Sequence, residues 1–173
     1  TACTVTEERN GSYELTMVYP VAGWYFKEIR YKRYITAVPA DGEKPQPFEI
    51  YSISKPISGK VTIKARHISY QLSYIVTLPG EKEKTAETAL QSLGDLATTD
   101  CPFDFSSDII AKGTFQNSTP QSIRALLGGQ AGSILDVFGG EYLFDGYKVK
   151  LLKNRGSTIP VSLEYGKNII DLQ

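Results

Sequence analysis

Alternation of apolar and polar side chains with a period of two restricts the fold of this chain more than any other feature. It is clearest in residues 13–19 and 60–66, where the odd-numbered positions are apolar or aromatic and most even-numbered positions are polar. Each stretch therefore predicts a strand with one buried face. Residues 34–38 and 48–53 are rich in aromatic and β-branched side chains and are separated in part by the turn-forming residues 39–42. The four segments predict an antiparallel barrel or sandwich.

A helical pattern replaces this alternation after Pro79-Gly80 and the charged link of residues 81–84. Thr85 is a suitable N-cap, and Glu87 would lie in the first turn, where an acidic side chain favours the helix dipole. The apolar positions have the spacing of one helical face. They are Ala86, Ala89, Leu90, Leu93 and Ala97.

Two shorter helices are predicted further along the chain. In the first, Thr119 is the expected cap, Pro120 fits the first helical position, and Gly128-Gly129 ends the helix. Its apolar stripe consists of Ile123, Leu126 and Leu127. The second runs from Ser133 to Phe138 and ends at Gly139-Gly140 in the same way.

The dipeptide Asp145-Gly146 predicts a β-hairpin, because both residues suit the positive φ angles of a type I′ turn. Counting outward from this turn gives three pairs, the last of which joins opposite charges: Phe144 with Tyr147, Tyr142 with Val149, and Glu141 with Lys150. The residues expected to share one face are Tyr142, Phe144, Tyr147, Val149 and Leu151. A further strand is predicted for Ile159–Tyr165, closed by Gly166.

These segments indicate a β-rich α+β fold in two parts. We predict a barrel-like antiparallel β domain over residues 1–78, and an α+β domain with two or three short helices and a β-hairpin over residues 79–173. A chain of 173 residues with 41% hydrophobic composition can bury a core of this size. The chain begins at Thr1 without methionine, and we expect upstream residues to be missing.

Charge and hydropathy disfavour two classes of partner. Nineteen basic and nineteen acidic side chains cancel, so no net positive charge attracts nucleic acid or an anionic membrane surface. No apolar run approaches the roughly 20 residues that cross a bilayer. We therefore expect neither membrane association nor specific nucleic-acid binding. Cys3 and Cys101 match no zinc, redox or disulfide-dense pattern, and reduced, partly buried thiols are expected.

Candidate catalytic residues are few. His67 is the only histidine, so it is the one imidazole available as a general base or a metal ligand. It falls in line with the apolar positions of residues 61–65, which favours a hydrogen-bonded histidine at a barrel end or an interface over a Cys101–His67 dyad. Metalloproteases need two histidines, and residues 166–168 do not form a phosphate loop. We predict no catalytic, cofactor-binding or metal-binding residue.

Two groups of side chains leave alternatives open. Paired carboxylates act in glycosidases, although solvated charges and helix caps are the favoured interpretation here. The candidates are Asp104, Asp108, Asp136, Glu141 and Asp145. Aromatic side chains can stack on sugar rings, although a place in the core or in a subunit contact is favoured. These aromatic residues are Tyr19, Trp24, Tyr25, Phe26, Tyr31 and Tyr34.

Six short segments together resemble, in order and spacing, the prophage tail endopeptidase family, whose members are also described as phage minor structural proteins. Residues 128–145 are the most diagnostic, with Ser-Ile-Leu-Asp at 133–136 and Gly-Gly-Glu at 139–141. Residues 5–16 are similar to the opening of the family, with Asn-Gly followed by Tyr-Glu-Leu. The other segments are Pro47–Tyr51, Ala65–Tyr70, Cys101–Phe103 and Tyr165–Asn168.

The resemblance implies a structural protein of a long-tailed phage or prophage rather than an enzyme. Members form a hub of the baseplate-hub type at the distal end of the tail, commonly a homotrimer, which closes the tail tube and opens for DNA. The implied partners are further copies of the chain, the distal tail ring and the tail tube proteins. The implied location is the virion tail tip, after assembly in the host cytoplasm. Endopeptidase activity, where present in the family, belongs to a carboxy-terminal domain absent from this chain.

Two other functions are kept as alternatives. One is a peptidoglycan hydrolase that acts through a pair of the carboxylates named above. The other is a wall-carbohydrate-binding module that uses the aromatic residues between Tyr19 and Tyr34.

Overall fold

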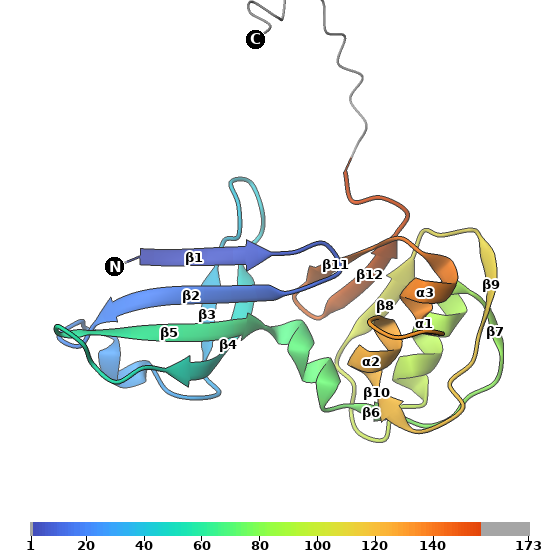
Figure 1. The fold of residues 1–173 in the computed structure, drawn as a ribbon, viewed down its shortest axis with the longest axis horizontal. Helices are drawn as coiled ribbons and strands as arrows, with labels where there is room; N and C mark the ends of the chain where they lie inside the picture. The colour runs from blue at the N-terminus through green and yellow to red at the C-terminus, as the bar shows by residue number, and fades with distance from the viewer. Residues whose placement is uncertain (1, 157–173) are drawn as a thin grey trace, which may run out of the picture.

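The computed structural model describes residues 2–156 of the chain. Five strands form one antiparallel sheet in the order β1-β2-β5-β4-β3, which curls into a half-barrel (Figure 1). The strands are β1 (Ala2–Glu7), β2 (Tyr13–Pro20), β3 (Tyr34–Ala37), β4 (Gln46–Ile53) and β5 (Lys60–His67). The four predicted strands and the β-rich α+β class are confirmed, and β1 adds an edge strand.

The buried face of this sheet follows the period-two pattern. Leu15 of β2 lies opposite Ala65 of β5, and Ala65 lies opposite Ile50 of β4, so one apolar row crosses three strands. All three side chains are buried, and full burial of a side chain of the size of leucine contributes about 1.5–3 kcal/mol. The short helix η1 (Phe26–Glu28) follows β2, and Phe26 packs against this core.

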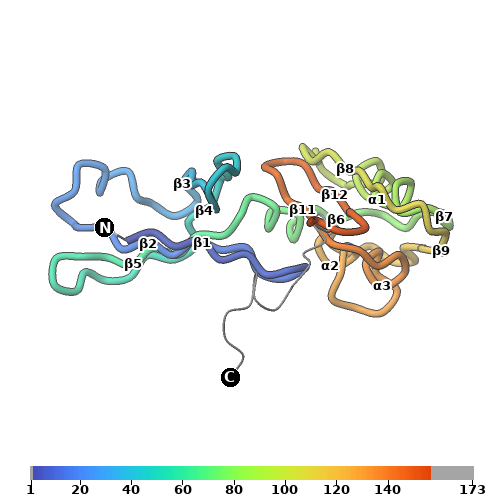
Figure 2. The backbone as a smooth tube through the Cα atoms, turned by 90° about the horizontal axis from the view of Figure 1, so that it is seen from above, coloured from blue at the N-terminus to red at the C-terminus, as the bar shows by residue number. Residues whose placement is uncertain are grey.

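The remaining described residues form a second part made of short elements. These are η2 (Ile68–Ser73), β6 (Val76–Thr77), β7 (Glu83–Thr85), α1 (Ala86–Asp95), β8 (Asp104–Ser107), β9 (Lys112–Phe115), β10 (Gln121–Ser122), α2 (Ile123–Leu127), α3 (Ile134–Phe138), β11 (Glu141–Asp145) and β12 (Lys148–Leu152). Strand β8 joins the β11–β12 hairpin parallel to β12, and α1 packs against β8. Figures 1 and 2 show this part at one end of the five-stranded sheet, to which η2 connects it.

Side-chain oxygen atoms cap the three α-helices. Thr85 caps α1 as predicted, and Ser133 caps α3; each accepts a hydrogen bond from the backbone N–H three residues later, at 3.2 and 3.3 Å. The prediction of Thr119 as the cap of α2 is wrong, because Ser122 has this role. Pairing of β10 with β6 holds residues 121–122 extended, so the helix begins only after them.

The predicted hairpin forms, but with a different register. Asp145 pairs with Lys148, which leaves Gly146 and Tyr147 in the turn. Gly146 has a φ of 58°, as the first central residue of a type II′ turn requires. Each partner is therefore shifted by two positions, so the apolar side chains of both strands still share the buried face, whereas Tyr147 is exposed. The predicted pairs Phe144–Tyr147, Tyr142–Val149 and Glu141–Lys150 are wrong, and the observed pairs are Phe144–Val149, Tyr142–Leu151 and Glu141–Leu152.

Two predictions are not tested by this fold. The strand Ile159–Tyr165 and Gly166 lie outside the described residues. The division between residues 1–78 and 79–173 stays a prediction; one hydrophobic cluster includes Phe48 of β4 and Phe144 of β11. No helix in the described part of the chain is long and apolar enough to span a membrane.

Gly140, immediately before β11, offers a test of the close packing at the hairpin. Its φ is 99°, and a Cβ atom there would lie 2.6 Å from the carbonyl oxygen of Leu152. We expect Gly140→Ala to lower the free energy of unfolding by about 3 kcal/mol, because backbone strain and a main-chain clash combine. Gly132→Ala is the matched control: its φ is 77° and its Cβ would meet open space, so only the strain of a positive φ, about 1 kcal/mol, is expected. Equal losses in urea unfolding would contradict this account.

Candidate functional site

Many of the residues singled out in the sequence lie where the five-stranded sheet meets the β11–β12 hairpin, a contact that we call the seam. Asn10, in the turn between β1 and β2, donates from Nδ2 to the carbonyl oxygen of Gly140 at 3.0 Å. Its Oδ1 accepts the backbone N–H of Tyr142 at 2.8 Å. Asn10 has a φ of 53°, a conformation that asparagine tolerates better than most residues. One side chain thus bonds two backbone groups on the far side of the seam.

Two ion pairs lie beside Asn10. Arg155 binds both carboxylate oxygen atoms of Glu7, and the longer of the two contacts is 3.2 Å. Arg9 contacts Glu141 at 3.0 Å, so the partner of Glu141 is an arginine of the β1–β2 turn and not Lys150. The side chains of Glu7, Arg155 and Glu141 are between 16% and 25% exposed, which reduces screening by solvent. Because the Arg9 side chain is 72% exposed, the Arg9–Glu141 pair contributes less than the Glu7–Arg155 pair, which joins β1 to the segment after β12.

His67 occupies the centre of the seam and is fully buried. Its Nδ1 accepts the backbone N–H of Ser69 at 3.2 Å and lies 3.0 Å from the Ser69 hydroxyl, while Nε2 lies 3.2 Å from Oε1 of Gln46. The imidazole ring stacks on Tyr13, with 4.5 Å between ring centroids. Both nitrogen atoms have partners, and His67 is the last residue of β5, so the interpretation as a hydrogen-bonded histidine at the end of the half-barrel is confirmed.

Gln46 extends this hydrogen-bonded chain into the hairpin. Its Oε1 accepts the backbone N–H of Gly146 at 2.7 Å, and its Nε2 donates to Oδ1 of Asp145 at 2.9 Å. The latter hydrogen bond, together with Lys44, holds the pKa of the Asp145 carboxyl below its usual value. Burial lowers the pKa of His67 to about 4, and the nearby Arg124 guanidinium adds to the effect. The imidazole is therefore neutral near pH 7.

The five carboxylates considered as a catalytic pair have separate surroundings. Asp136 accepts the backbone N–H of residue 132 at 2.8 Å, and Asp108 accepts that of residue 153 at 2.7 Å. Glu141 and Asp145 are held at the seam, and Asp104 is exposed on β8. Within residues 2–156, no three His, Cys, Asp or Glu side chains gather as a metal site. This arrangement gives no support to an acid-pair mechanism.

The two cysteines are free thiols in separate places. Cys3 is exposed on β1, whereas Cys101 is half-buried near Gln91 and Phe103 beside α1. The side-chain hydrogen-bond partners of His67 are Ser69 and Gln46, and neither cysteine is among them. The structure therefore does not bring Cys101 and His67 together as a dyad.

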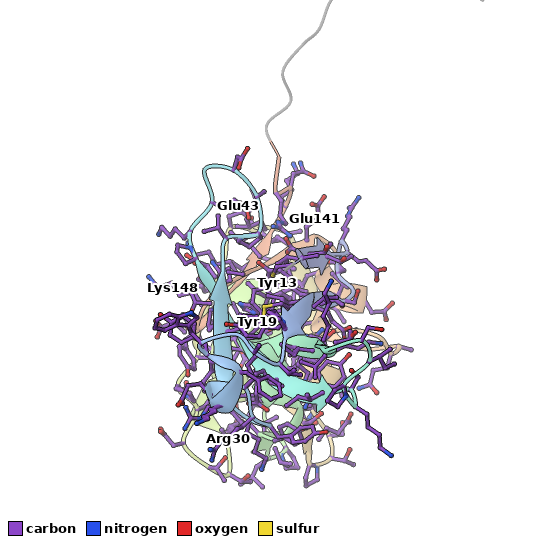
Figure 3. The ribbon with its side chains drawn as sticks, turned by 90° about the vertical axis from the view of Figure 1, so that its left-hand side faces the viewer. Tyr13, Tyr19, Arg30, Glu43, Glu141 and Lys148 are labelled. Atoms are coloured by element: carbon purple, nitrogen blue, oxygen red, sulfur yellow. The ribbon has the colours of Figure 1, made fainter. Side chains whose placement is uncertain are left out.

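The aromatic residues between positions 19 and 34 divide into two groups. Tyr19 and Phe26 pack against the core, and the Tyr19 hydroxyl accepts the backbone N–H of residue 25 at 3.2 Å. Figure 3, which views the sheet from its free end, shows Tyr19 within the outline of the molecule and Arg30 at its border. The exposed members are Trp24, Tyr25, Tyr31 and Tyr34, of which Trp24 is 97% exposed. The core interpretation thus holds for only two of the six.

A groove of about 760 Å³ lies beside β4 and η2 and includes one of the exposed aromatic residues, Tyr31. Tyr51 and Tyr74 line it as well, and the Arg66 guanidinium lies 5.7 and 5.6 Å from their ring centroids. Gln71 donates to the Glu49 carboxylate at 3.0 Å along the same wall. We call this region the tyrosine groove. Tyr51 and Tyr74 were not singled out in the sequence, because they come from elements outside the aromatic stretch.

Arg124 was also not recognised from the sequence. Its guanidinium carbon lies 4.5 Å from the ring centroid of Tyr70 and 5.4 Å from that of Phe144, and its Nη2 donates to the carbonyl oxygen of Gly11 at 3.3 Å. These partners belong to η2, β11 and the β1–β2 turn. The sequence carried one signal: an arginine stands within the otherwise apolar α2 segment.

The depressed pKa of His67 predicts a specific dependence of stability on pH. The unfolded chain binds a proton on this histidine near pH 6.5, whereas the folded protein resists it until about pH 4. Stability present at neutral pH is therefore lost as the pH falls through this window, by about 1.4 kcal/mol per pH unit. Urea unfolding between about pH 6 and pH 5 measures the slope. His67→Gln removes the only histidine, and an unchanged slope in that variant would contradict the assignment.

Comparison with known proteins identifies a similar fold. No family model matches the chain, and no curated protein matches it significantly. A solved structure does match, the prophage tail protein gp18 from Listeria monocytogenes EGD-e, with a TM-score of 0.68 and 16% sequence identity. The match covers 97% of this chain and 49% of gp18, so the chain spans about half the length of that protein. The chain therefore has the fold of one half of a prophage tail protein.

Proposed function

We propose that this chain is part of a structural protein in the tail of a long-tailed phage or prophage, and that it belongs to the hub at the tail tip. The observation that carries the proposal is the match of nearly the whole chain, 97%, to a prophage tail protein at a TM-score of 0.68. Sheet, seam and helical part are all included in a match of that extent.

The finer assignment, to the prophage tail endopeptidase family, rests on the sequence motifs and is supported by where these lie. Asn10 and the Gly139-Gly140 pair adopt positive φ angles on either side of the seam. Ser133 caps α3, the helix that leads into these glycines, and His67 lies at the centre of the seam. Residues with such geometric requirements tolerate few substitutions. A family defined by its fold would therefore keep motifs of this kind.

In this proposal the function is mechanical. Copies of the hub surround a channel, most simply as a trimer, and contact the distal tail ring and the tail tube. The edge strand β1 offers a surface for such contacts: within the described residues it pairs only with β2, and its residues 2–6 are uncharged. Edge strands that avoid association commonly carry charges, prolines or bulges. Affinity would come from buried apolar area and edge pairing.

The oligomeric state of a polypeptide extended in both directions tests the hub assignment. We expect a stable trimer, because a closed ring uses the same contact surfaces in every copy. Light scattering coupled to size-exclusion chromatography gives the mass, and dilution gives the dissociation range. If the extended polypeptide remains monomeric at high concentration, the assignment to a hub is wrong.

The tyrosine groove favours a second candidate function, binding of wall carbohydrate. Tyr31, Tyr51 and Tyr74 expose ring surface along a groove that also contains amide and carboxylate groups. Aromatic faces with adjacent polar groups are suited to sugar rings.

A pull-down on purified wall polysaccharide tests this second candidate. We expect Tyr74→Ala to reduce retention about ten-fold, equivalent to about 1.4 kcal/mol, and Trp24→Ala to leave it unchanged because Trp24 lies outside the groove. Equal effects of the two substitutions would indicate non-specific adhesion, and absence of retention by the unmodified chain would exclude this function.

A further inference from the structure

A separate cavity of about 450 Å³ lies between the β1–β2 turn, η2 and α2. Its lining contains a single charged side chain, Arg124, and no aspartate, glutamate or lysine. Three serine hydroxyls and two leucine side chains share the wall with it. They are Ser12, Ser73, Ser122, Leu127 and Leu135. The cavity thus combines one cation with neutral hydrogen-bonding groups and apolar surface.

Arg124 has no acidic partner in the described part of the chain. No carboxylate between residues 2 and 156 lies within 4 Å of its guanidinium, whereas Arg9, Arg33 and Arg155 each contact one. Its Nη1 is buried without a hydrogen-bond partner. Burial lowers the pKa of the guanidinium, and neither of the two groups that oppose this shift, Tyr70 and Tyr142, is a carboxylate. The cation is thus partly desolvated and has no carboxylate to balance its charge within the described residues.

The aromatic rings fix the guanidinium but compensate it only in part. A cation–π contact contributes about 0.5–2 kcal/mol, while removing a cation from water costs several kcal/mol. Stacking on Tyr70 also restricts the side-chain torsions, so binding an anion would order few additional groups. The planar guanidinium has five N–H donors, and Nη2 uses one of them for the carbonyl oxygen of Gly11, so donors remain for a carboxylate.

We propose that this cavity binds a carboxylate carried on a small apolar body. A single cation balances a single negative charge, whereas a phosphate dianion would leave one charge unbalanced. The leucine side chains provide the apolar wall, and the volume lies in the range of about 300–1,000 Å³ typical of ligand sites. A free organic acid or the carboxylate of another protein chain has the required chemistry. The inference does not depend on the proposed tail function.

Titration of the full chain with hexanoate at neutral pH, followed by calorimetry or by NMR, tests the site. Arg124→Gln should weaken hexanoate binding at least about ten-fold, or 1.4 kcal/mol. Arg66→Gln is the matched control, because Arg66 also stacks on Tyr70, at 5.5 Å, but donates to the Tyr74 hydroxyl and does not line the cavity. Its hexanoate affinity should be unchanged. Hexanamide, the neutral analogue, should not bind measurably.

Several results would overturn the proposal. They are absence of saturable hexanoate binding, unchanged affinity in Arg124→Gln, hexanamide bound as well as hexanoate, and inorganic phosphate bound more tightly than hexanoate. If Arg124→Gln fails to fold, Arg124→Lys provides the test, since an ammonium group keeps the charge but loses the planar fork and should weaken binding. A tripeptide ending in leucine, with a free or an amidated carboxyl group, distinguishes the sources. Tighter binding of the free-acid peptide than of hexanoate assigns a chain end, and the reverse assigns a free acid.

Discussion

The arrangement of the two parts depends on side chains of the sheet that bond the backbone of the hairpin. Asn10 bonds the carbonyl group of Gly140 and the N–H of Tyr142, and Gln46 bonds the N–H of Gly146. A backbone group buried without such a partner costs about 1–3 kcal/mol, so these contacts are directional where apolar packing is not. The hydrophobic cluster draws sheet and hairpin together, while the polar contacts select one orientation.

The same requirement explains why short motifs far apart in the sequence belong together. Asn10, Gly139 and Gly140 need backbone conformations that few residue types adopt, and Ser133 places the helix that precedes the glycines. His67 completes the set from the end of β5, where its ring stacks on that of Tyr13 from β2. These motifs therefore reflect the backbone geometry that the seam requires. Their resemblance to a family is then a statement about fold, in agreement with the structural match to a prophage tail protein.

Local patterns predicted what depends on local forces. The strand faces of β2 and β5, the Thr85 cap and the helix stop at Gly139 follow from alternation, capping and positive φ. The errors arise where a partner distant in the sequence decides: β10 is extended because it pairs with β6, and β8 lies along β12 beside the shifted hairpin. The seam itself was not predicted; His67 was expected only to be hydrogen-bonded at a barrel end or an interface. The roles of Gln46 and Arg124 could not be predicted from local patterns, because their hydrogen-bond partners Gly146 and Gly11 lie 100 and 113 residues away in the sequence.

The chemistry of the seam bears on what kind of function the molecule can support. Its one histidine has both ring nitrogen atoms bonded and a pKa of about 4, so it is a poor general base near pH 7. Arg124, next to it, is held between aromatic rings and lowers that pKa further. Other accessible groups are different in kind: an edge strand whose residues 2–6 are uncharged, exposed tyrosines and a cavity with one cation. Edges, aromatic surfaces and single charges can bind partners without breaking bonds, which accords with the structural role proposed above.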